Sequence, residues 1–327
     1  MKILIAVGLS SLFLSLACGF VVIPLLRKIK AGQTVLKYVE SHKEKNGTPT
    51  MGGLFFIIPS CIIFFIFGGL NGRIATVSLS IGLAFLLVGF LDDFIKIKFK
   101  RNEGLKAYQK IIFQFAIAVL SGVFAFVNGI TVFHLPFCGK SVNLGVFTIP
   151  VIALVFIAIT NSVNLTDGLD GLAGSVSVVY LFFITILISL QCSSFKSMYL
   201  KPDEYEKLNV LSACLIGGIL AFLVFNTPKA KVFMGDTGSL SLGGFIGAIS
   251  VFSSNSFFIP VIGIMFVISS ISVIIQVAYY KKTHKRIFLM APLHHHFQLK
   301  GYSETKISYL YSLITALFGL LSILIYL

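Results

Sequence analysis

Residues 148–190 read TIPVIALVFIAITNSVNLTDGLDGLAGSVSVVYLFFITILISL, and this stretch decides the fold class. Two apolar runs, at 148–163 and 171–190, flank a short polar island, which is the pattern of two membrane-spanning helices joined by a tight loop. The composition extends this pattern to the whole chain, because 57% of the 327 residues are hydrophobic and only 12% are charged. A soluble domain usually carries about 25% charged residues. The sequence therefore predicts an all-α integral membrane protein, with residues 1–327 as a single polytopic domain.

Similar apolar runs predict about ten transmembrane helices. Their expected ranges are 3–26, 53–70, 74–91, 111–127, 148–163, 171–190, 208–226, 239–254, 257–279 and 306–326. Between 239 and 279 the apolar character is interrupted by residues 253–256, SSNS, and by Pro260. This part therefore forms either two spans or one span followed by a bent or re-entrant piece.

Basic residues set the expected orientation in the membrane. About 20 of the 26 lysines and arginines fall in or beside alternate loops, and cytoplasmic loops carry such an excess. The predicted inside loops are 27–52, 92–110, 164–170, 227–238 and 280–305. Both termini are then expected outside. The net charge of +14 follows from this asymmetry and suits anionic lipid or phosphate, so we exclude nucleic acid as a partner.

The outer face is expected to carry one small β-hairpin. Residues 128–147 alternate apolar positions around Pro136 and Gly139, which is a hairpin pattern. Cys138 and Cys192 also fall in outer segments, where a disulfide is compatible with the topology but gains little support from the spacing. The sequence contains no P-loop, GxSxG, HExxH or CxxC motif, which argues against nucleotide-driven pumps, serine hydrolases and zinc proteases.

The polar island itself, residues 161–174, reads NSVNLTDGLDGLAG. Asn161, Asn164, Asp167 and Asp170 recur at every third position, so they share one face if the island is helical or turn-like. Two interpretations stay open. Asp167 or the preceding threonine could cap the next helix, or the carboxylates and amides could bind a metal ion or a polar ligand.

Every aspartate in the predicted inside loops lies close to a membrane boundary. Asp92 and Asp93 close the third predicted span, where adjacent carboxylates repel each other and oppose the helix dipole. A cation would relieve both penalties, and Mg²⁺ fits because it takes oxygen ligands and is often shared with phosphates. The simpler alternative is a solvated acidic pair bridged to Lys96, four residues after Asp92.

Three further motifs lie in the inside loops. Asp236 stands in FMGDTGSLSLGG, where small and hydroxyl residues at a helix start leave N–H groups free for a phosphate, although Asp236 or Thr237 could simply cap that helix. Residues 46–53, NGTPTMGG, form a turn with hydroxyls beside Lys45. Three consecutive histidines in APLHHHFQ cannot all point the same way, so phosphate or sugar binding is favoured over a zinc site.

Taken in order, TPTMGG, LDD, NSVNLTDGLDGLAG, FMGDTGSLSLGG and APLHHHFQ resemble the motifs of the phospho-N-acetylmuramoyl-pentapeptide transferases. This family is a branch of the polyprenyl-phosphate N-acetylhexosamine-1-phosphate transferase superfamily. The resemblance covers essentially the whole chain. The PLHHHF stretch looks more like the muramoyl-pentapeptide branch than the N-acetylglucosamine branch.

The resemblance implies a reaction of peptidoglycan synthesis at the bacterial inner membrane. Undecaprenyl phosphate attacks the β-phosphate of UDP-N-acetylmuramoyl-pentapeptide, UMP leaves and lipid I forms, with Mg²⁺ as the cofactor. The resemblance places the active site on the cytoplasmic face, in agreement with the charge pattern, and suggests a homodimer. Because a phosphate monoester is largely ionised at neutral pH, direct attack by the lipid is favoured over a covalent aspartyl intermediate.

Residue roles follow from the same resemblance. The implied catalytic residues are Asp92, Asp93, Asp236, His294, His295 and His296. The implied substrate-binding residues are Lys45, Thr50, Lys110, Asn164, Asp167, Gly168, Asp170, Asn226 and Phe233, the last of which would stack on uracil. Asp236 and Asp167 are the implied metal ligands.

Two competing functions remain. A sister transferase would move N-acetylglucosamine-1-phosphate to the same lipid. A secondary transporter would instead place its polar groups near mid-membrane, whereas the aspartates here gather at one face.

Overall fold

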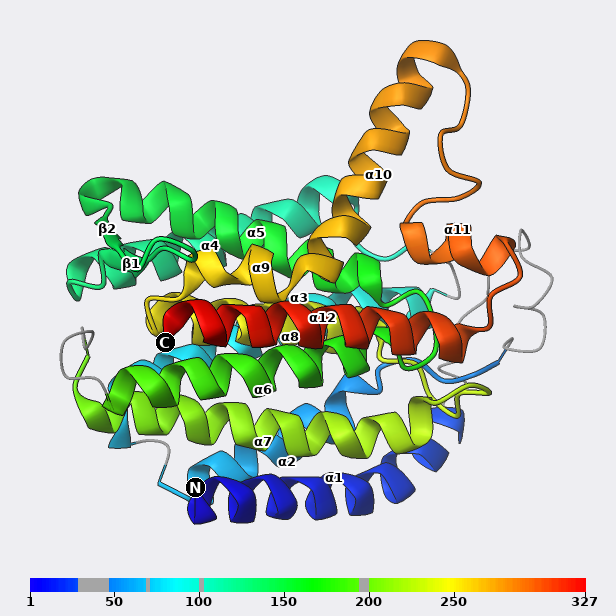
Figure 1. Cartoon of the computed structure of the whole chain (residues 1–327). Coiled ribbons are helices and arrows are strands. Elements are labelled where there is room, and N and C mark those ends of the chain that lie inside the picture. Colours follow the sequence, from blue (N-terminus) through cyan, green and yellow to red (C-terminus); the bar gives the residue numbers. More distant parts are fainter. Residues whose placement is uncertain (29–46, 69–70, 100–102, 194–199) are drawn as a thin grey trace.

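The computed structural model describes residues 1–28, 47–68, 71–99, 103–193 and 200–327. Helices dominate the described residues (Figure 1). The α-helices are α1 (Lys2–Lys28), α2 (Gly53–Ile66), α3 (Arg73–Lys98), α4 (Ala107–Val127), α5 (Thr148–Thr166), α6 (Leu172–Ser193), α7 (Pro202–Asn226), α8 (Gly235–Phe252), α9 (Ile259–Ile262), α10 (Ile264–Thr283), α11 (Leu293–Leu299) and α12 (Glu304–Tyr326). The 3₁₀ helices η3 (Gly145–Phe147) and η5 (Ser256–Phe258) precede α5 and α9.

The all-helical membrane class is confirmed. Within the described ranges, eight helices are long and apolar enough to cross a membrane, and each coincides with a predicted span. They are α1, α3, α4, α5, α6, α7, α10 and α12. Of the other two predicted spans, α2 is apolar but has only 14 residues, and α8 is rich in glycine and serine.

The interrupted stretch between 239 and 279 forms two separate parts. α8 ends at Phe252, and the chain then turns through η5 and the four-residue α9 before Gly263. After Gly263, α10 leaves the bundle at a steep angle and projects from its edge (Figure 1). Near its base, Ser270 donates a hydrogen bond to Ser162 on α5 at 2.7 Å. Further along, Ile274 is 65% exposed, so the described residues leave this side of α10 largely uncovered.

The predicted hairpin is present. β1 (Val132–His134) and β2 (Ser141–Asn143) pair antiparallel, with Phe133 opposite Val142. In Figure 1 the hairpin and both chain termini lie at the same end of the bundle, and α11 lies at the opposite end. All five cysteines are free, so Cys138 and Cys192 are not joined by a disulfide.

α8 is the buried centre of the bundle, because every residue from Thr237 to Phe252 is buried. Its most extensive packing partner is α3. The two backbones approach so closely that a side chain on Gly89 of α3 would collide with the carbonyl of Asp236. Small residues permit such contacts between membrane helices. This crossing brings the end of α3 directly against the start of α8.

Candidate active site

Three carboxylates meet at the α3–α8 crossing. Asp92 and Asp93 lie near the end of α3, and Asp236 lies in the first turn of α8. One oxygen from each lies within 4.8 Å of the others, and we call these three residues the aspartate triad. The side chains of Asp92 and Asp93 are 1% exposed and that of Asp236 is 17% exposed. Buried like charges at such a distance repel one another strongly unless cations compensate them.

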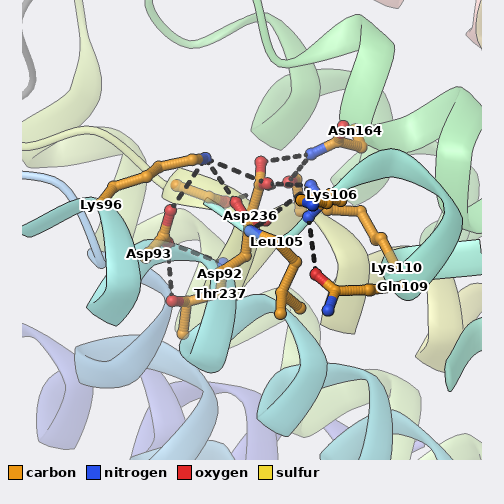
Figure 2. Close-up of polar contacts among 12 residues, drawn as sticks. Asp92, Asp93, Lys96, Leu105, Lys106, Gln109, Lys110, Asn164, Asp236 and Thr237 are labelled. Carbon is orange, nitrogen blue, oxygen red and sulfur yellow. Dashed lines mark hydrogen bonds and ion pairs between the residues drawn. The ribbon is translucent and has the colours of Figure 1, made fainter. Parts of the chain in front are cut away.

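Two lysines supply positive charge to the triad (Figure 2). Lys96 Nζ lies 2.6 Å from Asp92, 3.5 Å from Asp93 and 3.2 Å from Asp236. Lys110 Nζ, from α4, lies 2.6 Å from Asp236 and 3.2 Å from Asp92. The salt bridge expected from the four-residue spacing of Asp92 and Lys96 is therefore present, but Lys96 also reaches both other acids.

Asp93 has a second task at the start of α8. Its Oδ2 accepts hydrogen bonds from the Thr237 N–H at 2.9 Å and from the Thr237 hydroxyl at 2.7 Å. Asp93 therefore caps α8 from a neighbouring helix, where a carboxylate also meets the positive end of the helix dipole. The expectation that Asp236 or Thr237 caps this helix locally is wrong, because no side chain caps its start from within the same segment.

The other two acids are also held in place. Asn164 Nδ2 donates to Asp236 Oδ1 at 2.8 Å and to the Ser239 hydroxyl at 2.8 Å. The Leu105 N–H donates to Asp92 Oδ1 at 2.9 Å, which fixes Asp92 from the loop before α4. Each acid of the triad thus has at least one uncharged donor that fixes its orientation.

The polar island continues α5 by one turn and then ends it. Asn161 and Asn164 are helical, and Asp167 is the residue that terminates α5. Burial, followed by the charges of Asp236 and Asp93, raises the pKa of Asp167 to about 8. Asp167 therefore lies near the triad but outside the group of three whose oxygens converge.

Two predicted substrate-binding residues brace the loops around the site. Asp170 Oδ2 accepts the Ala230 N–H at 3.1 Å. Asn226 Oδ1 accepts the Gly171 N–H at 2.9 Å, and its Nδ2 donates to the Val232 carbonyl at 2.8 Å. Both side chains are almost fully buried. Their observed contacts are structural, since they join the island to the loop that leads into α8.

The three histidines lie on the short helix α11 and have different surroundings. His294 is fully buried, and burial holds its pKa well below the usual value of 6.5. A side chain on Gly168 would collide with the His294 ring, so the ring lies directly against this glycine. His295 Nδ1 lies 3.1 Å from Gln298 Oε1, and His296 Nδ1 accepts the Leu289 N–H at 3.1 Å. The contact between His294 and Gly168 therefore joins the histidine motif to the polar island.

The turn before α2 also reaches the site. Gly52 N–H donates to the Phe233 carbonyl at 2.9 Å, and Phe233 N–H donates to the Pro49 carbonyl at 2.8 Å. Thr50 is 2% exposed, and its hydroxyl and the Asp93 carboxylate both face Gly235. Lys45, which was predicted beside this turn, lies outside the described residues.

Comparison with known proteins settles the family. Residues 74–254 match the glycosyl transferase family 4, and residues 45–57 match the phospho-N-acetylmuramoyl-pentapeptide-transferase signature 1. A phospho-N-acetylmuramoyl-pentapeptide-transferase of Clostridium botulinum is 42% identical over 302 residues, covering 92% of this chain and 90% of the relative. Those of Clostridioides difficile and Thermoanaerobacter sp. are 41% and 43% identical, and the matches cover 94% of this chain with 92% and 94% of the relatives. The chain belongs to the phospho-N-acetylmuramoyl-pentapeptide-transferase family.

The two ranges that match the family models contain most of the candidate active site of this chain. The whole triad, both lysines and the polar island fall within residues 74–254, and Thr50 falls within the signature. The histidines of α11 lie beyond both matched ranges, but the alignments with whole relatives span more than nine-tenths of the chain.

The triad suits a hard divalent cation. Its donors are carboxylate oxygens, which Mg²⁺ prefers, and they come from two helices whose crossing is rigidly packed. The adjoining lysines provide donors suited to phosphate oxygens.

Sequence reasoning missed Lys96 as a site residue and Thr237 as the partner of Asp93. The four-residue spacing of Asp92 and Lys96 was the only available signal, and it could not show that Lys96 also reaches the two other acids.

Proposed function

We propose that this protein transfers phospho-N-acetylmuramoyl-pentapeptide from its UDP derivative to undecaprenyl phosphate in a bacterial inner membrane. The products are lipid I and UMP. The observation that carries the proposal is the aspartate triad with its two lysines, buried at the end of membrane helices in a chain of this family. Such a site can bind a diphosphate close to a lipid phosphate held in the bilayer.

The proposed chemistry is one displacement at phosphorus. An oxygen of undecaprenyl phosphate forms a bond to the β-phosphorus of the nucleotide sugar. The bond from that phosphorus to the bridging oxygen breaks, and UMP leaves with the electron pair. The lipid phosphate is already largely ionised at neutral pH, so the main tasks of the protein are to position both substrates and to offset their charge.

The residues of the site divide these tasks. Lys96 and Lys110, which contact the triad, would donate hydrogen bonds to phosphate oxygens, and Asp92 would orient the lipid phosphate. The triad would hold Mg²⁺, with Asp236 as its principal ligand and Asp167 nearby. When bound, Mg²⁺ would stabilise negative charge on the diphosphate. Neutral His294 and the adjoining His295 would line the sugar or phosphate side through their contact with Gly168.

The orientation of the site is part of the proposal. Asp167 lies near the triad and the adjoining Gly168 meets His294 of α11, so the triad belongs to the α11 end of the bundle, opposite the termini and the hairpin (Figure 1). Basic residues are concentrated from the last turn of α10 (Lys281, Lys282) through the segment that leads past α11 to α12 (Lys285, Arg286, Lys300). The positive-inside rule assigns this end to the cytoplasm, where the nucleotide sugar is available.

A transfer assay tests the function. Purified protein in detergent is given undecaprenyl phosphate and either UDP-N-acetylmuramoyl-pentapeptide or UDP-N-acetylglucosamine, and lipid product and UMP are measured with Mg²⁺ or a chelator. We expect transfer from the muramoyl-pentapeptide donor only, and only with the metal. Transfer from the N-acetylglucosamine donor alone would assign the chain to the sister reaction. The matched control for Asp236→Asn is Asp203→Asn. Asp203 is an exposed acid in the first turn of α7, whereas the other end of α7 leads into the loop before α8.

A further inference from the structure

We propose that Lys96 and Lys110 act as internal counter-cations that keep the affinity of the aspartate triad for a divalent cation low until a diphosphate enters the site. The proposal rests on the proposed function, because that reaction brings the metal and the diphosphate together. It gives the two lysines a regulatory task, which is to make metal binding depend on the nucleotide substrate.

The first argument is shared ligand atoms. Asp236 Oδ2 lies 3.2 Å from Lys96 Nζ and 2.6 Å from Lys110 Nζ, so both ammonium groups contact the same oxygen. Lys96 also contacts Asp92 Oδ2 at 2.6 Å and Asp93 Oδ1 at 3.5 Å. A divalent cation among these carboxylates needs the same oxygens at about 2.1 Å, and it would repel ammonium groups left at hydrogen-bond distance. Metal and lysines therefore compete for the triad.

The second argument is the charge of the cluster. Three carboxylates and two ammonium groups leave one net negative charge among the contacting residues. A divalent cation alone would turn this into a net positive charge in a largely buried site, which is unfavourable. A diphosphate brings at least two negative charges, so the metal and the diphosphate together restore a negative balance. Metal binding and diphosphate binding should then strengthen each other by the same factor.

The third argument is that the lysine side chains can change conformation more easily than the acid side chains. Each acid is fixed by an uncharged donor: Asp92 by the Leu105 N–H, Asp93 by Thr237 and Asp236 by Asn164. The ammonium groups of Lys96 and Lys110 instead contact the triad carboxylates themselves, and their side chains are 17% and 21% exposed, against 1% for Asp92 and Asp93. A lysine ends in a flexible stem that can redirect its charge. The lysines can therefore turn from the carboxylates to the phosphate oxygens, while the acids stay in place for the metal.

A direct metal-binding measurement tests the proposal without catalysis. Mn²⁺ is titrated into purified full-length protein in detergent, and free Mn²⁺ is measured by electron paramagnetic resonance, with and without UDP as a diphosphate probe. We expect Lys96→Gln to bind Mn²⁺ about 30-fold more tightly than the wild type in the absence of UDP, because one unit charge about 4 Å from a divalent ion costs about 2 kcal/mol even in a water-like medium. We also expect UDP to strengthen Mn²⁺ binding less in the variant than in the wild type.

The matched control is Lys98→Gln, which removes the same charge two residues further along α3. Lys98 is exposed and packs over the rings of Phe94 and Phe99, away from the triad. Its Mn²⁺ affinity should equal that of the wild type. Lys110→Gln, on another helix, should repeat the Lys96 result and serves if Lys96→Gln does not fold.

Three results would overturn the proposal. They are unchanged or weaker Mn²⁺ binding in the folded lysine variant, an equal change in Lys98→Gln, and unchanged coupling to UDP. The Mn²⁺ titration without UDP needs neither nucleotide nor lipid, whereas the proposed function is tested by lipid product formation in the wild type. Failure of one is therefore distinguishable from failure of the other.

Discussion

The contact between Asp93 and Thr237 should determine how firmly α8 is held against α3. Thr237→Val removes the hydroxyl that donates to Asp93 Oδ2 at 2.7 Å and keeps the shape of the side chain and the backbone N–H bond. Asp93 is 1% exposed, so water cannot replace the missing donor. The variant therefore leaves a buried carboxylate with one fewer hydrogen bond.

The expected loss follows from the chemistry of this bond. A hydrogen bond to a charged group contributes about 1.5–3 kcal/mol to stability, so the unfolding equilibrium should shift by roughly 10- to 150-fold. Transfer should also slow, because Thr237 adjoins Asp236 and a looser start of α8 would disturb the whole triad. We expect both effects in the same variant.

Unfolding in mixed detergent micelles measures the free energy, with Thr160→Val as the matched control. Thr160 is also fully buried, but its hydroxyl donates only within its own helix, to the Phe156 carbonyl at 2.7 Å and weakly to that of Ile157. Such back-bonding adds little to stability, so the control should stay close to the wild type.

A double-mutant cycle with Asp93→Asn isolates the interaction between the two side chains. Contacting residues of this kind usually show coupling energies of about 0.5–3 kcal/mol. If Thr237→Val is as stable as Thr160→Val, or if its effect simply adds to that of Asp93→Asn, then Asp93 does not hold α8 in the way described.

Three further outcomes are expected. Asp92→Asn and Asp236→Asn should each abolish UMP release while the protein still folds, and near-normal turnover in either purified variant would show that the triad assignment is wrong. Gly168→Ala forces a methyl group against the His294 ring, so transfer should fall and crowding should cost about 1–3 kcal/mol; a wild-type rate and unfolding curve would contradict the contact. The pKa of Asp167 rises from 3.8 to about 8, so the stability that its carboxyl contributes is fully present below the lower value and is lost as pH rises through the higher one. Asp167→Asn should flatten this loss in unfolding measured across that range, and an unchanged pH profile would refute the shift.

Much of the fold could be predicted because a membrane-spanning helix corresponds to one continuous apolar run in the sequence. Each apolar run had to become a helix, since backbone groups cannot go unpaired in lipid. The sequence shows the interruption of the apolar run near Pro260, but it does not show which structure forms there. Gly263 ends α9, and α10 departs at an angle that depends on its packing against α5 and α12. Packing partners distant in the sequence leave no local signal.

The site was predictable as a set of acids at one boundary, but the tasks of its members were not. Asp170 and Asn226 are polar residues in the right loops, and only their contacts show that they brace the backbone. The capping of α8 was assigned to its own segment, because a local pattern cannot reveal a cap that comes from Asp93 on another helix. Lys96 looked like half of a simple helical ion pair for the same reason.

The polar island between two apolar runs, together with the ordered motifs, determined the class, the family resemblance and the candidate acids of the site. These features depend on composition and spacing, which the chain carries whether or not it is folded. Only the tertiary structure decided that Asp92 and Asp93 meet Asp236, that two lysines share one oxygen of Asp236, and that His294 lies against Gly168. The physical reason is the close approach of α3 and α8, because a crossing that only small residues permit brings acids more than 140 positions apart within contact of the same ammonium group.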